Sequence, residues 1–165
     1  MKKIYQIDHL LKKIKKEKNK NKKIIHCHGV FDLIHVGHIK HFQEAKKNGD
    51  FLLVSITSDK YVNKGSGRPI FNENLRAEVI SSLETVDAVY INHYKTPEKL
   101  ISTIKPNIYF KGPDYKDIKK DKTKNILKEI SCVKKHGGKI LFSSDITFSS
   151  SNLINNHSDY YNAKQ

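Results

Sequence analysis

The residues best suited to chemistry are two histidines, His35 and His38, which stand on either side of Gly37. They follow an apolar run over 24–28 that predicts a strand, and they open a helical pattern, so both imidazoles should project toward one side of the first helical turn. That turn also presents unpaired backbone N–H groups and the positive end of the helix dipole. Neutral or protonated imidazoles placed there can donate hydrogen bonds to a phosphate that gains charge during in-line displacement. The spacing therefore predicts chemistry at a phosphate group.

Such a pair needs a scaffold, and the apolar patterns along the chain predict one. Strands are expected at 24–28, 51–57, 88–91, 108–111 and 139–142, and helices at 37–47, 72–83, 96–104 and 123–136. Asn72 is expected to cap its helix, as are Thr96 and Pro97 theirs. Strands separated by helices of this length pair in parallel through right-handed crossovers. The fold class predicted is α/β, a single Rossmann-like domain in which an open parallel sheet carries helices on both faces.

Three segments are expected along the chain. Residues 24–154 are expected to form the domain, and residues 155–165 a tail. Residues 1–23 predict a short amphipathic helix followed by a basic linker over 15–23. We interpret this basic run mainly as solvated surface, and the alternative is an arm that attracts polyphosphates.

The net charge of +14 raises the possibility of a nucleic-acid partner. All but two of the 31 basic residues are lysines, however, and lysine lacks the planar fork of arginine that binds bases and phosphates bidentately. The two cysteines form no CxxC pair, and the N-terminus has no apolar stretch that resembles a signal sequence. No run approaches the ~18 apolar residues of a membrane span. We therefore expect a cytoplasmic protein with neither a nucleic-acid nor a membrane partner.

Ligands of open parallel sheets bind at the carboxyl ends of the strands, and polar residues follow several of the predicted strands. After the second strand, Lys64 and Arg68 flank two glycines, which predicts a mobile loop with two cations that can close over a triphosphate; the alternative is a solvated turn. Mg²⁺ usually binds through one or two carboxylates and phosphate oxygens, so Asp32 and Asp59 are its candidate ligands.

A second group of polar residues follows the fourth strand. Asp114 is suited to accept hydrogen bonds from sugar hydroxyls, and Lys111 to face the phosphate of an acceptor. The alternative is a plain turn built on Gly112, Pro113 and Asp114.

The segment from Gly29 to His38, GVFDLIHVGH, resembles the GxFDxxHxGH signature of the cytidylyltransferase-like nucleotidyltransferases. Glycerol-3-phosphate cytidylyltransferase and heptose 1-phosphate adenylyltransferase belong to that family. The segments at 64–69, 74–78 and 111–115 are similar to the KGxGRP, NxxRAE and KGxDY stretches of its sugar-phosphate branch. The segment at 148–154 resembles its STTxII motif, with serines in place of both threonines. The alternatives are two histidines that merely pack a helix start, a surface ion pair at Arg76, and a serine helix cap.

The resemblance implies a nucleotidyltransferase that moves NMP from CTP or ATP to a sugar or polyol phosphate and releases pyrophosphate. It implies Mg²⁺ with the NTP, a homodimer, and either the transferase half of a kinase–transferase pair or its free-standing version. Alternatives are adenylyl transfer to a flavin or pantetheine phosphate, and a non-catalytic nucleic-acid-binding module. The expected catalytic residues are His35, His38 and Lys64; the expected nucleotide-binding residues are Gly29, Val30, Phe31, Asp32, Gly37, Arg68, Arg76, Ser149, Ser150 and Ser151; the expected acceptor-binding residues are Asp59, Lys111, Gly112, Asp114 and Tyr115.

Overall fold

Five parallel strands form one open sheet in the order β3-β2-β1-β4-β5 in the computed structural model, which describes residues 3–115 and 125–144. The strands are β1 (Ile24–Gly29), β2 (Phe51–Thr57), β3 (Ala88–Asn92), β4 (Ile108–Lys111) and β5 (Lys139–Phe142). Each predicted strand is confirmed to within one residue at either end. The strand order reverses direction beside β1, because β2 and β3 lie on one side of it and β4 and β5 on the other.

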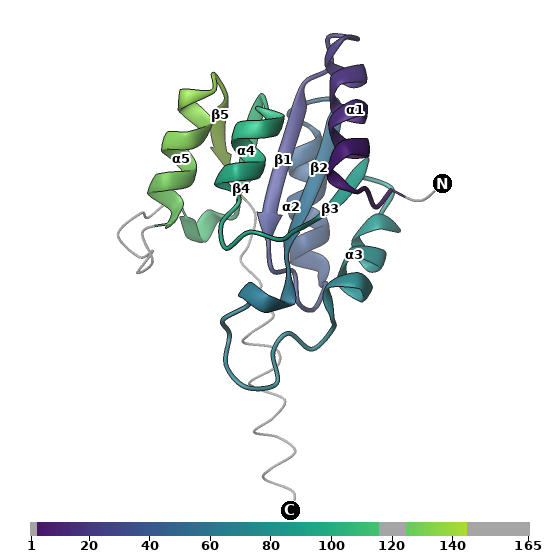
Figure 1. Ribbon diagram of the computed structural model, residues 1–165, viewed down its shortest axis with the longest axis vertical. Coiled ribbons are helices and arrows are strands. Elements are labelled where there is room, and N and C mark those ends of the chain that lie inside the picture. Colours follow the sequence, from purple (N-terminus) through teal and green to yellow (C-terminus); the bar gives the residue numbers. More distant parts are fainter. Residues whose placement is uncertain (1–2, 116–124, 145–165) are drawn as a thin grey trace, which may run out of the picture.

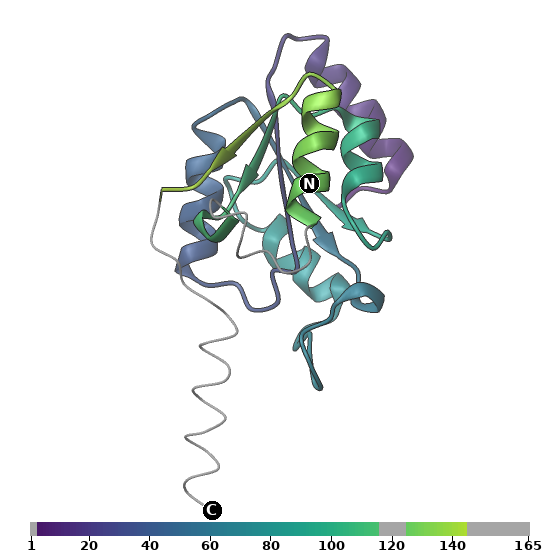
Figure 2. The ribbon, with the colours of Figure 1, turned by 90° about the vertical axis from the view of Figure 1, so that its left-hand side faces the viewer.

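Helices cover both faces of this sheet, as predicted (Figure 1). They are α1 (Ile7–Lys18), α2 (Val36–Lys46), α3 (Glu73–Ser81), α4 (Glu98–Ile104) and α5 (Asn125–Lys135), with short 3-10 turns η1 (Asp59–Tyr61) and η2 (Pro113–Tyr115). One core cluster joins the sheet to α2 and α3, and two others join its opposite face to α1, α4 and α5. Figure 2 shows α2 on one side of the sheet and α1, α4 and α5 on the other.

The alternation of side chains along β1 explains this layering. Ile25 and Cys27 face the cluster of α2 and α3, whereas Ile24 faces that of α1 and α4. All seven residues of β2 are buried, as expected for a strand that is paired on both sides and covered on both faces.

The helix starts follow the predictions in part. The side chain of Asn72 caps α3 by accepting a hydrogen bond from the backbone N–H of Leu75 at 3.0 Å. In α4, however, Pro97 occupies the cap position predicted for Thr96, and no side chain caps this helix. The carbonyl of Thr96 instead accepts a hydrogen bond from the amide of Asn92, which holds it at the end of β3.

The prediction of a solvated linker over residues 15–23 is wrong in part. α1 continues to Lys18, because Glu17 is only 3% exposed and forms ion pairs with Lys13 and Lys22. Hydrogen bonds from Lys22 and Lys13 lower the pKa of Glu17 to about 2. Leu10 of α1 packs in the same core as the strands, so α1 shares the core of the domain that was expected to begin at residue 24.

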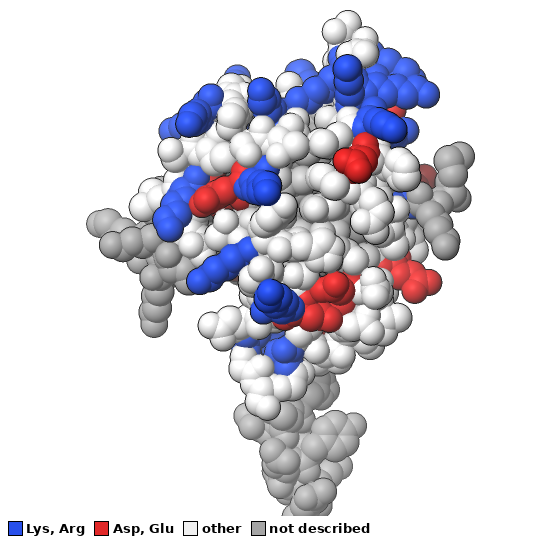
Figure 3. Space-filling view, in the orientation of Figure 1, with Lys and Arg blue, Asp and Glu red and all other residues white. Residues whose placement is uncertain are grey.

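The exposed lysines of this region lie at one end of the molecule. Lys15, Lys16, Lys20 and Lys23 are exposed near the end of α1, where basic side chains gather at the top of Figure 3. This end is the amino rim, the edge of the sheet at which the strands begin. The run lies at the edge opposite the carboxyl ends of the strands, and the alternative of an arm that attracts polyphosphates stays untested.

Tight turns at the amino rim depend on glycine. A Cβ atom at Gly49 would lie 2.4 Å from Cδ1 of Ile25, and one at Gly138 would lie 2.5 Å from the carbonyl oxygen of Pro106. The carboxyl rim, where the strands end, carries the longer loops. None of the described helices is long and apolar enough to cross a membrane.

Candidate active site

The paired histidines lie at the carboxyl rim, where β1 leads into α2. His35 is the N-cap residue of α2, and its Nδ1 accepts a hydrogen bond from the backbone N–H of Gly37 at 3.1 Å. The rings of His35 and His38 stack with their centroids 3.9 Å apart and their planes 26° apart. The prediction that both imidazoles lie on one side of the first helical turn is confirmed.

The protonation state of these rings follows from their surroundings. Because Nδ1 of His35 accepts a hydrogen bond, the neutral ring carries its proton on Nε2. Burial lowers the pKa of His35. Burial, together with the nearby positive charges of His35, His41 and Lys64, lowers the pKa of His38 to about 3. The structure therefore favours neutral imidazoles over protonated ones at neutral pH, and the His38 ring also makes a hydrogen bond with the backbone of Leu33.

Phe31 packs against His38 of this pair. Its ring meets the rings of His38 and Phe42 edge-on, with centroids 5.3 and 5.2 Å apart. A Cβ at Gly29 would approach the Phe31 ring to between 3.0 and 3.2 Å. Packing against Phe31 is thus one physical reason for a glycine at position 29, and direct contact of Gly29, Phe31 or Gly37 with a nucleotide stays a prediction.

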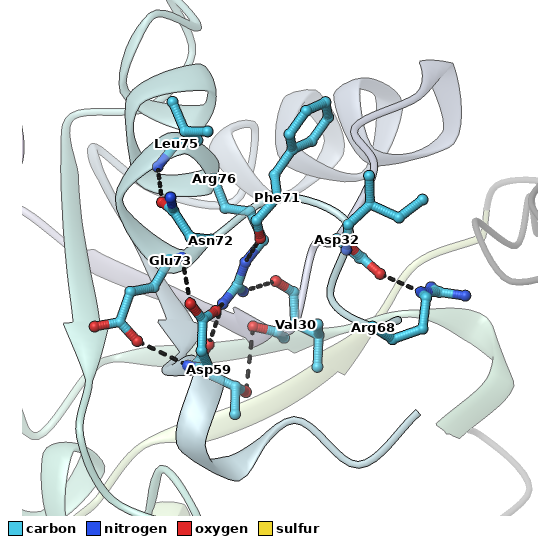
Figure 4. A network of polar contacts seen from close by, with 12 residues as sticks. Val30, Asp32, Asp59, Arg68, Phe71, Asn72, Glu73, Leu75 and Arg76 are labelled. Carbon is cyan, nitrogen blue, oxygen red and sulfur yellow. Dashed lines mark hydrogen bonds and ion pairs between the residues drawn. The ribbon is translucent and has the colours of Figure 1, made fainter. Parts of the chain in front are cut away.

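Asp32 anchors the loop that follows η1. Its carboxylate is 2% exposed, pairs with Nε of Arg68 and accepts a hydrogen bond from the backbone N–H of Ile70 at 2.6 Å (Figure 4). The Arg68 side chain is 8% exposed, and its Nη2 is buried without a hydrogen-bond partner among the described residues. Arg68 therefore holds the end of the loop through Nε, and its contact with a nucleotide stays a prediction.

Lys64 lies on the same loop and near the histidines. Its side chain is exposed, and its charge is close enough to His38 to lower the pKa of that ring. Gly65 and Gly67 on either side of Ser66 have positive φ angles of 94° and 71°, which glycine adopts without strain. Lys64 thus acts electrostatically on His38, and its contact with a phosphate stays a prediction.

Arg76 of α3 is buried, which rules out the alternative of a surface ion pair. It is 1% exposed, and four of its five N–H groups make hydrogen bonds. The acceptors are the carbonyls of Phe71, Val30 and Thr57 and the carboxylate of Asp59. Since these acceptors come from the end of β2 and from the loops after β1 and β2, Arg76 holds these segments together (Figure 4), and its contact with a phosphate stays a prediction.

The carboxylates suggested as Mg²⁺ ligands are both engaged. Asp59 binds Arg76 and also accepts from the backbone N–H of Glu73 at 3.1 Å, while Asp32 binds Arg68. Within residues 3–115 and 125–144, no three metal-ligating side chains come together. Each oxygen of the two carboxylates already accepts one hydrogen bond or ion pair, so a Mg²⁺ ion bound there would share these oxygens with the arginine and backbone donors.

Lys111 lies beside a carboxylate at the end of β4, and its predicted contact with an acceptor phosphate stays a prediction. It is 5% exposed, and its Nζ lies 3.1 Å from a carboxylate oxygen of Glu129. Its ammonium also lies 4.1 Å from the ring centroid of Tyr115, and the hydroxyl of Tyr109 donates to Glu129 at 2.9 Å. Glu129 thus balances the charge of Lys111 beneath Tyr115.

Asp114 and Tyr115 of η2 are exposed at the carboxyl rim, and Gly112 beside them leaves open space around its Cα. These positions fit residues that contact a ligand from solution. Their role in acceptor binding stays a prediction, as does that of Asp59.

Sequence reasoning missed three groups near the rim: His28, Glu129 and Glu44. Glu44 of α2 accepts hydrogen bonds from the hydroxyls of Ser143 and Ser144 and from the backbone N–H of Ser144. It thereby joins α2 to the chain leaving β5, which leads toward the predicted serine motif. Ser149, Ser150 and Ser151 themselves lie outside the described residues.

An open parallel sheet with two neutral imidazole donors and a lysine-bearing loop at its carboxyl rim defines a nucleotide-binding domain of the nucleotidyltransferase type. Residues 26–156 match the family model described as Cytidylyltransferase-like. The chain belongs to this cytidylyltransferase-like family.

Relatives agree with this assignment. The chain is 44% identical over 115 residues to the bifunctional protein HldE of Geobacter metallireducens, covering 68% of this chain and 24% of that protein. It is 46% identical over 99 residues to HldE of Aliarcobacter butzleri, covering 59% of this chain and 21% of that protein. The chain therefore spans about a quarter of the length of the curated relatives it matches.

Two solved structures resemble the fold. The lipopolysaccharide core biosynthesis protein of Thermoplasma volcanium superimposes with a TM-score of 0.62 at 31% identity, over 76% of this chain and 99% of that one. Pantoate-beta-alanine ligase of Francisella tularensis superimposes with a TM-score of 0.58 at 18% identity, over 88% of this chain and 70% of that one. The second likeness supports the fold alone.

Proposed function

We propose that this chain transfers NMP from an NTP to the phosphate of a small sugar or polyol phosphate and releases pyrophosphate. The observation that carries the proposal is the stacked pair of neutral imidazoles, His35 and His38, next to Lys64 at the carboxyl rim. Similarity to the bifunctional HldE proteins and to a lipopolysaccharide core biosynthesis protein supports a sugar phosphate as acceptor. Heptose 1-phosphate with ATP is the first pair to test.

The reaction needs no nucleophile from the protein. A phosphate oxygen of the acceptor attacks the α-phosphorus of the NTP, an O–P bond forms there, and the bond to the β-phosphate oxygen breaks with its electron pair leaving on pyrophosphate. The acceptor is a phosphate monoester that is already anionic at neutral pH, so no general base has to remove a proton. Catalysis then consists of positioning and of stabilising charge.

The histidines suit the second task because they are neutral. A neutral N–H donor strengthens its hydrogen bond as charge develops on the α-phosphate, without holding the substrate more tightly beforehand as a full charge would. The proposal gives Lys64, whose charge acts on His38, the role of supplying positive charge to the triphosphate. Arg68 and Asp32 fix the loop that carries Lys64.

Mg²⁺ is proposed to arrive on the triphosphate, where it neutralises charge on the phosphate oxygens. The engagement of Asp32 and Asp59 with arginines speaks against a metal bound to the protein before the NTP. Homodimer formation, cytoplasmic location and pairing with a kinase domain stay predictions; sedimentation velocity measures the first.

The test is pyrophosphate release by the purified protein with ATP or CTP and each of three acceptors, namely heptose 1-phosphate, mannose 1-phosphate and glycerol 3-phosphate. We expect acceptor-dependent release with a sugar 1-phosphate, and none in a variant in which both His35 and His38 are replaced by Ala. Release that is independent of any acceptor, or that survives the double replacement, would contradict the proposal. Transfer to a flavin or pantetheine phosphate in the same assay would favour the other enzymatic alternative.

A further inference from the structure

A row of polar side chains crosses the carboxyl ends of the central strands on the face opposite α2. His28 of β1 lies directly beside Ser55 of β2, and Thr57 lies two residues further along the same face of β2. On the other side of β1, His26 pairs with Tyr109 of β4. Residues i and i+2 of a strand lie on one face, so Lys111 lies on the same face of β4 as Tyr109. Thr57, His28 and Lys111 therefore form a row across β2, β1 and β4.

This row lies where the sheet topology favours a ligand. The strand order reverses between β1 and β4, and the crevice at such a reversal is the usual ligand site of an open parallel sheet. His28 and Lys111 stand on the two strands that border it. As a residue His28 is partly exposed at this rim, and burial of its ring lowers its pKa well below the usual value, so a ligand would meet a neutral ring.

Hydrogen bonds fix which nitrogen of His28 carries the proton. The single hydroxyl of Ser55 lies 2.7 Å from Nε2 of His26 and 2.8 Å from Nδ1 of His28, so it donates to one ring and accepts from the other. If Nε2 of His26 accepted the hydrogen bond from Ser55, the proton of the neutral His26 ring would sit on Nδ1. That atom is buried without a hydrogen-bond partner among the described residues. Buried N–H groups without an acceptor are rarer than acceptors without a donor. In the favoured arrangement, Nε2 of His26 donates to the hydroxyl of Ser55, and this hydroxyl donates to Nδ1 of His28.

In this arrangement His28 presents an N–H group at Nε2, and its ring also makes a hydrogen bond with the backbone of Ser55. Its side-chain partner at Nε2 is the hydroxyl of Thr57 at 3.4 Å, a distance at the limit of a hydrogen bond. The Thr57 hydroxyl also reaches the carbonyl of Gly29 at only 3.5 Å. Both groups are thus held loosely enough to exchange these contacts for shorter ones with a ligand.

We propose that Nε2–H of His28 and the hydroxyl of Thr57 bind a hydroxyl group of the acceptor sugar. The inference rests on the proposed function and assigns a binding position for one hydroxyl of the acceptor. The charge balance favours a neutral hydroxyl over a phosphate at this position, because Glu129 already neutralises Lys111 at 3.1 Å and the exposed Asp114 adds a negative charge on the same rim. Ser55 and His26 act as positioning residues that set the proton on His28.

The test compares two replacements of His28 that keep different parts of its ring. In His28→Gln the side-chain amide can reach the position of Nε2, whereas in His28→Asn it reaches only that of Nδ1. With heptose 1-phosphate as acceptor, we expect His28→Asn to raise the acceptor KM roughly 10-fold, the usual size of one lost hydrogen bond, and His28→Gln to stay within about 3-fold of the wild type. The KM for ATP should stay unchanged in both, and in the exposed control His9→Gln.

The positioning role of Ser55 has its own readout. Nitrogen-15 NMR of histidine-labelled protein should show the proton of His28 on Nε2, and Ser55→Ala should mix the two tautomers and raise the acceptor KM without lowering kcat. A purely structural Ser55 would change thermal stability and leave KM and tautomer alone.

The outcomes separate this inference from the function on which it rests. An active wild type with an unchanged acceptor KM in His28→Asn, or a proton found on Nδ1, overturns the inference alone. A rise in the KM for ATP in place of the acceptor would assign the row to the nucleotide and overturn it too. A wild type that binds ATP but uses none of the acceptors overturns the proposed function, and this inference with it.

Discussion

Acid should destabilise this protein through His26, well above the pH at which carboxylates titrate. The ring is fully buried, and burial together with the charge of Lys111 lowers its pKa from 6.5 to about 3. A pKa that is lower in the folded state means that the unfolded chain binds more protons between these two values. The free energy of unfolding therefore falls as the pH falls below 6.5, and the loss is complete near pH 3.

The size of the effect follows from the two pKa values. At pH 5 the ring is protonated in about 97% of unfolded molecules but in only about 1% of folded ones, which lowers the free energy of unfolding by about 2 kcal/mol relative to pH 7.5. His38, with a pKa of about 3, adds a loss of similar size. Together these losses are a large fraction of the ~5–15 kcal/mol by which domains are usually stable.

Urea unfolding at pH 7.5 and pH 5 measures this loss. The His26→Gln variant lacks the titrating ring, so its loss between the two pH values should be smaller than that of the wild type by about 2 kcal/mol, whatever its absolute stability. The exposed His9→Gln is the matched control and should lose as much as the wild type. Glu17 does not interfere, because its pKa of about 2 and ordinary value of 4.5 both lie below pH 5.

The reasoning would be refuted by equal losses in the wild type and in His26→Gln. Such a result would mean that the His26 ring takes up a proton in the folded state as readily as in the unfolded chain. The tautomer assigned to His28 through Ser55 would then lose its basis as well.

Three further predictions concern the rim. His38→Ala should lower kcat by roughly 10²- to 10³-fold and leave the Kd for NTP nearly unchanged, because its donor acts on charge that develops in the transition state; unchanged pyrophosphate release would remove His38 from the chemistry. Lys64→Ala should weaken NTP binding in calorimetry and turnover together, whereas Lys60→Ala, whose ammonium lies over the Tyr61 ring, should change neither; equal losses at both positions would indicate a diffuse electrostatic effect. Asp114→Ala should raise the acceptor KM with NTP binding nearly intact, and a loss of NTP binding would assign Asp114 to the nucleotide.

Patterns that depend on neighbours in the chain could be predicted from the sequence. The strands emerged because apolar runs of four to seven residues alternate with helical patterns, and the sheet topology then followed from general rules of parallel pairing. The placement of His35 and His38 on one side of the helix start could be predicted from their spacing of three residues, whereas the stacking of their rings was not predicted.

Contacts between distant segments could not be predicted in this way. The acceptors of Arg76 are mostly backbone carbonyls, which every residue carries, so no side chain in the sequence marks them. Glu17 is buried because Asn21, with a φ of 59°, turns the chain so that Lys22 reaches back to it. His28 sits in an apolar strand pattern, where a histidine is indistinguishable from any core residue until its neighbours on β2 and β4 are known.

The two rims of the sheet are constrained in different ways. At the amino rim, Gly49 and Gly138 lie so close to Ile25 and Pro106 that any side chain would displace the neighbouring atoms, and no proposed contact with substrate lies there. At the carboxyl rim, Asp114 projects from a short exposed turn with open space at Gly112. Substitutions in the turns of the carboxyl rim can therefore change acceptor preference without disturbing the core. Sequence variation in this family should concentrate in the segment around 112–115, while the glycines at positions 49 and 138 stay fixed.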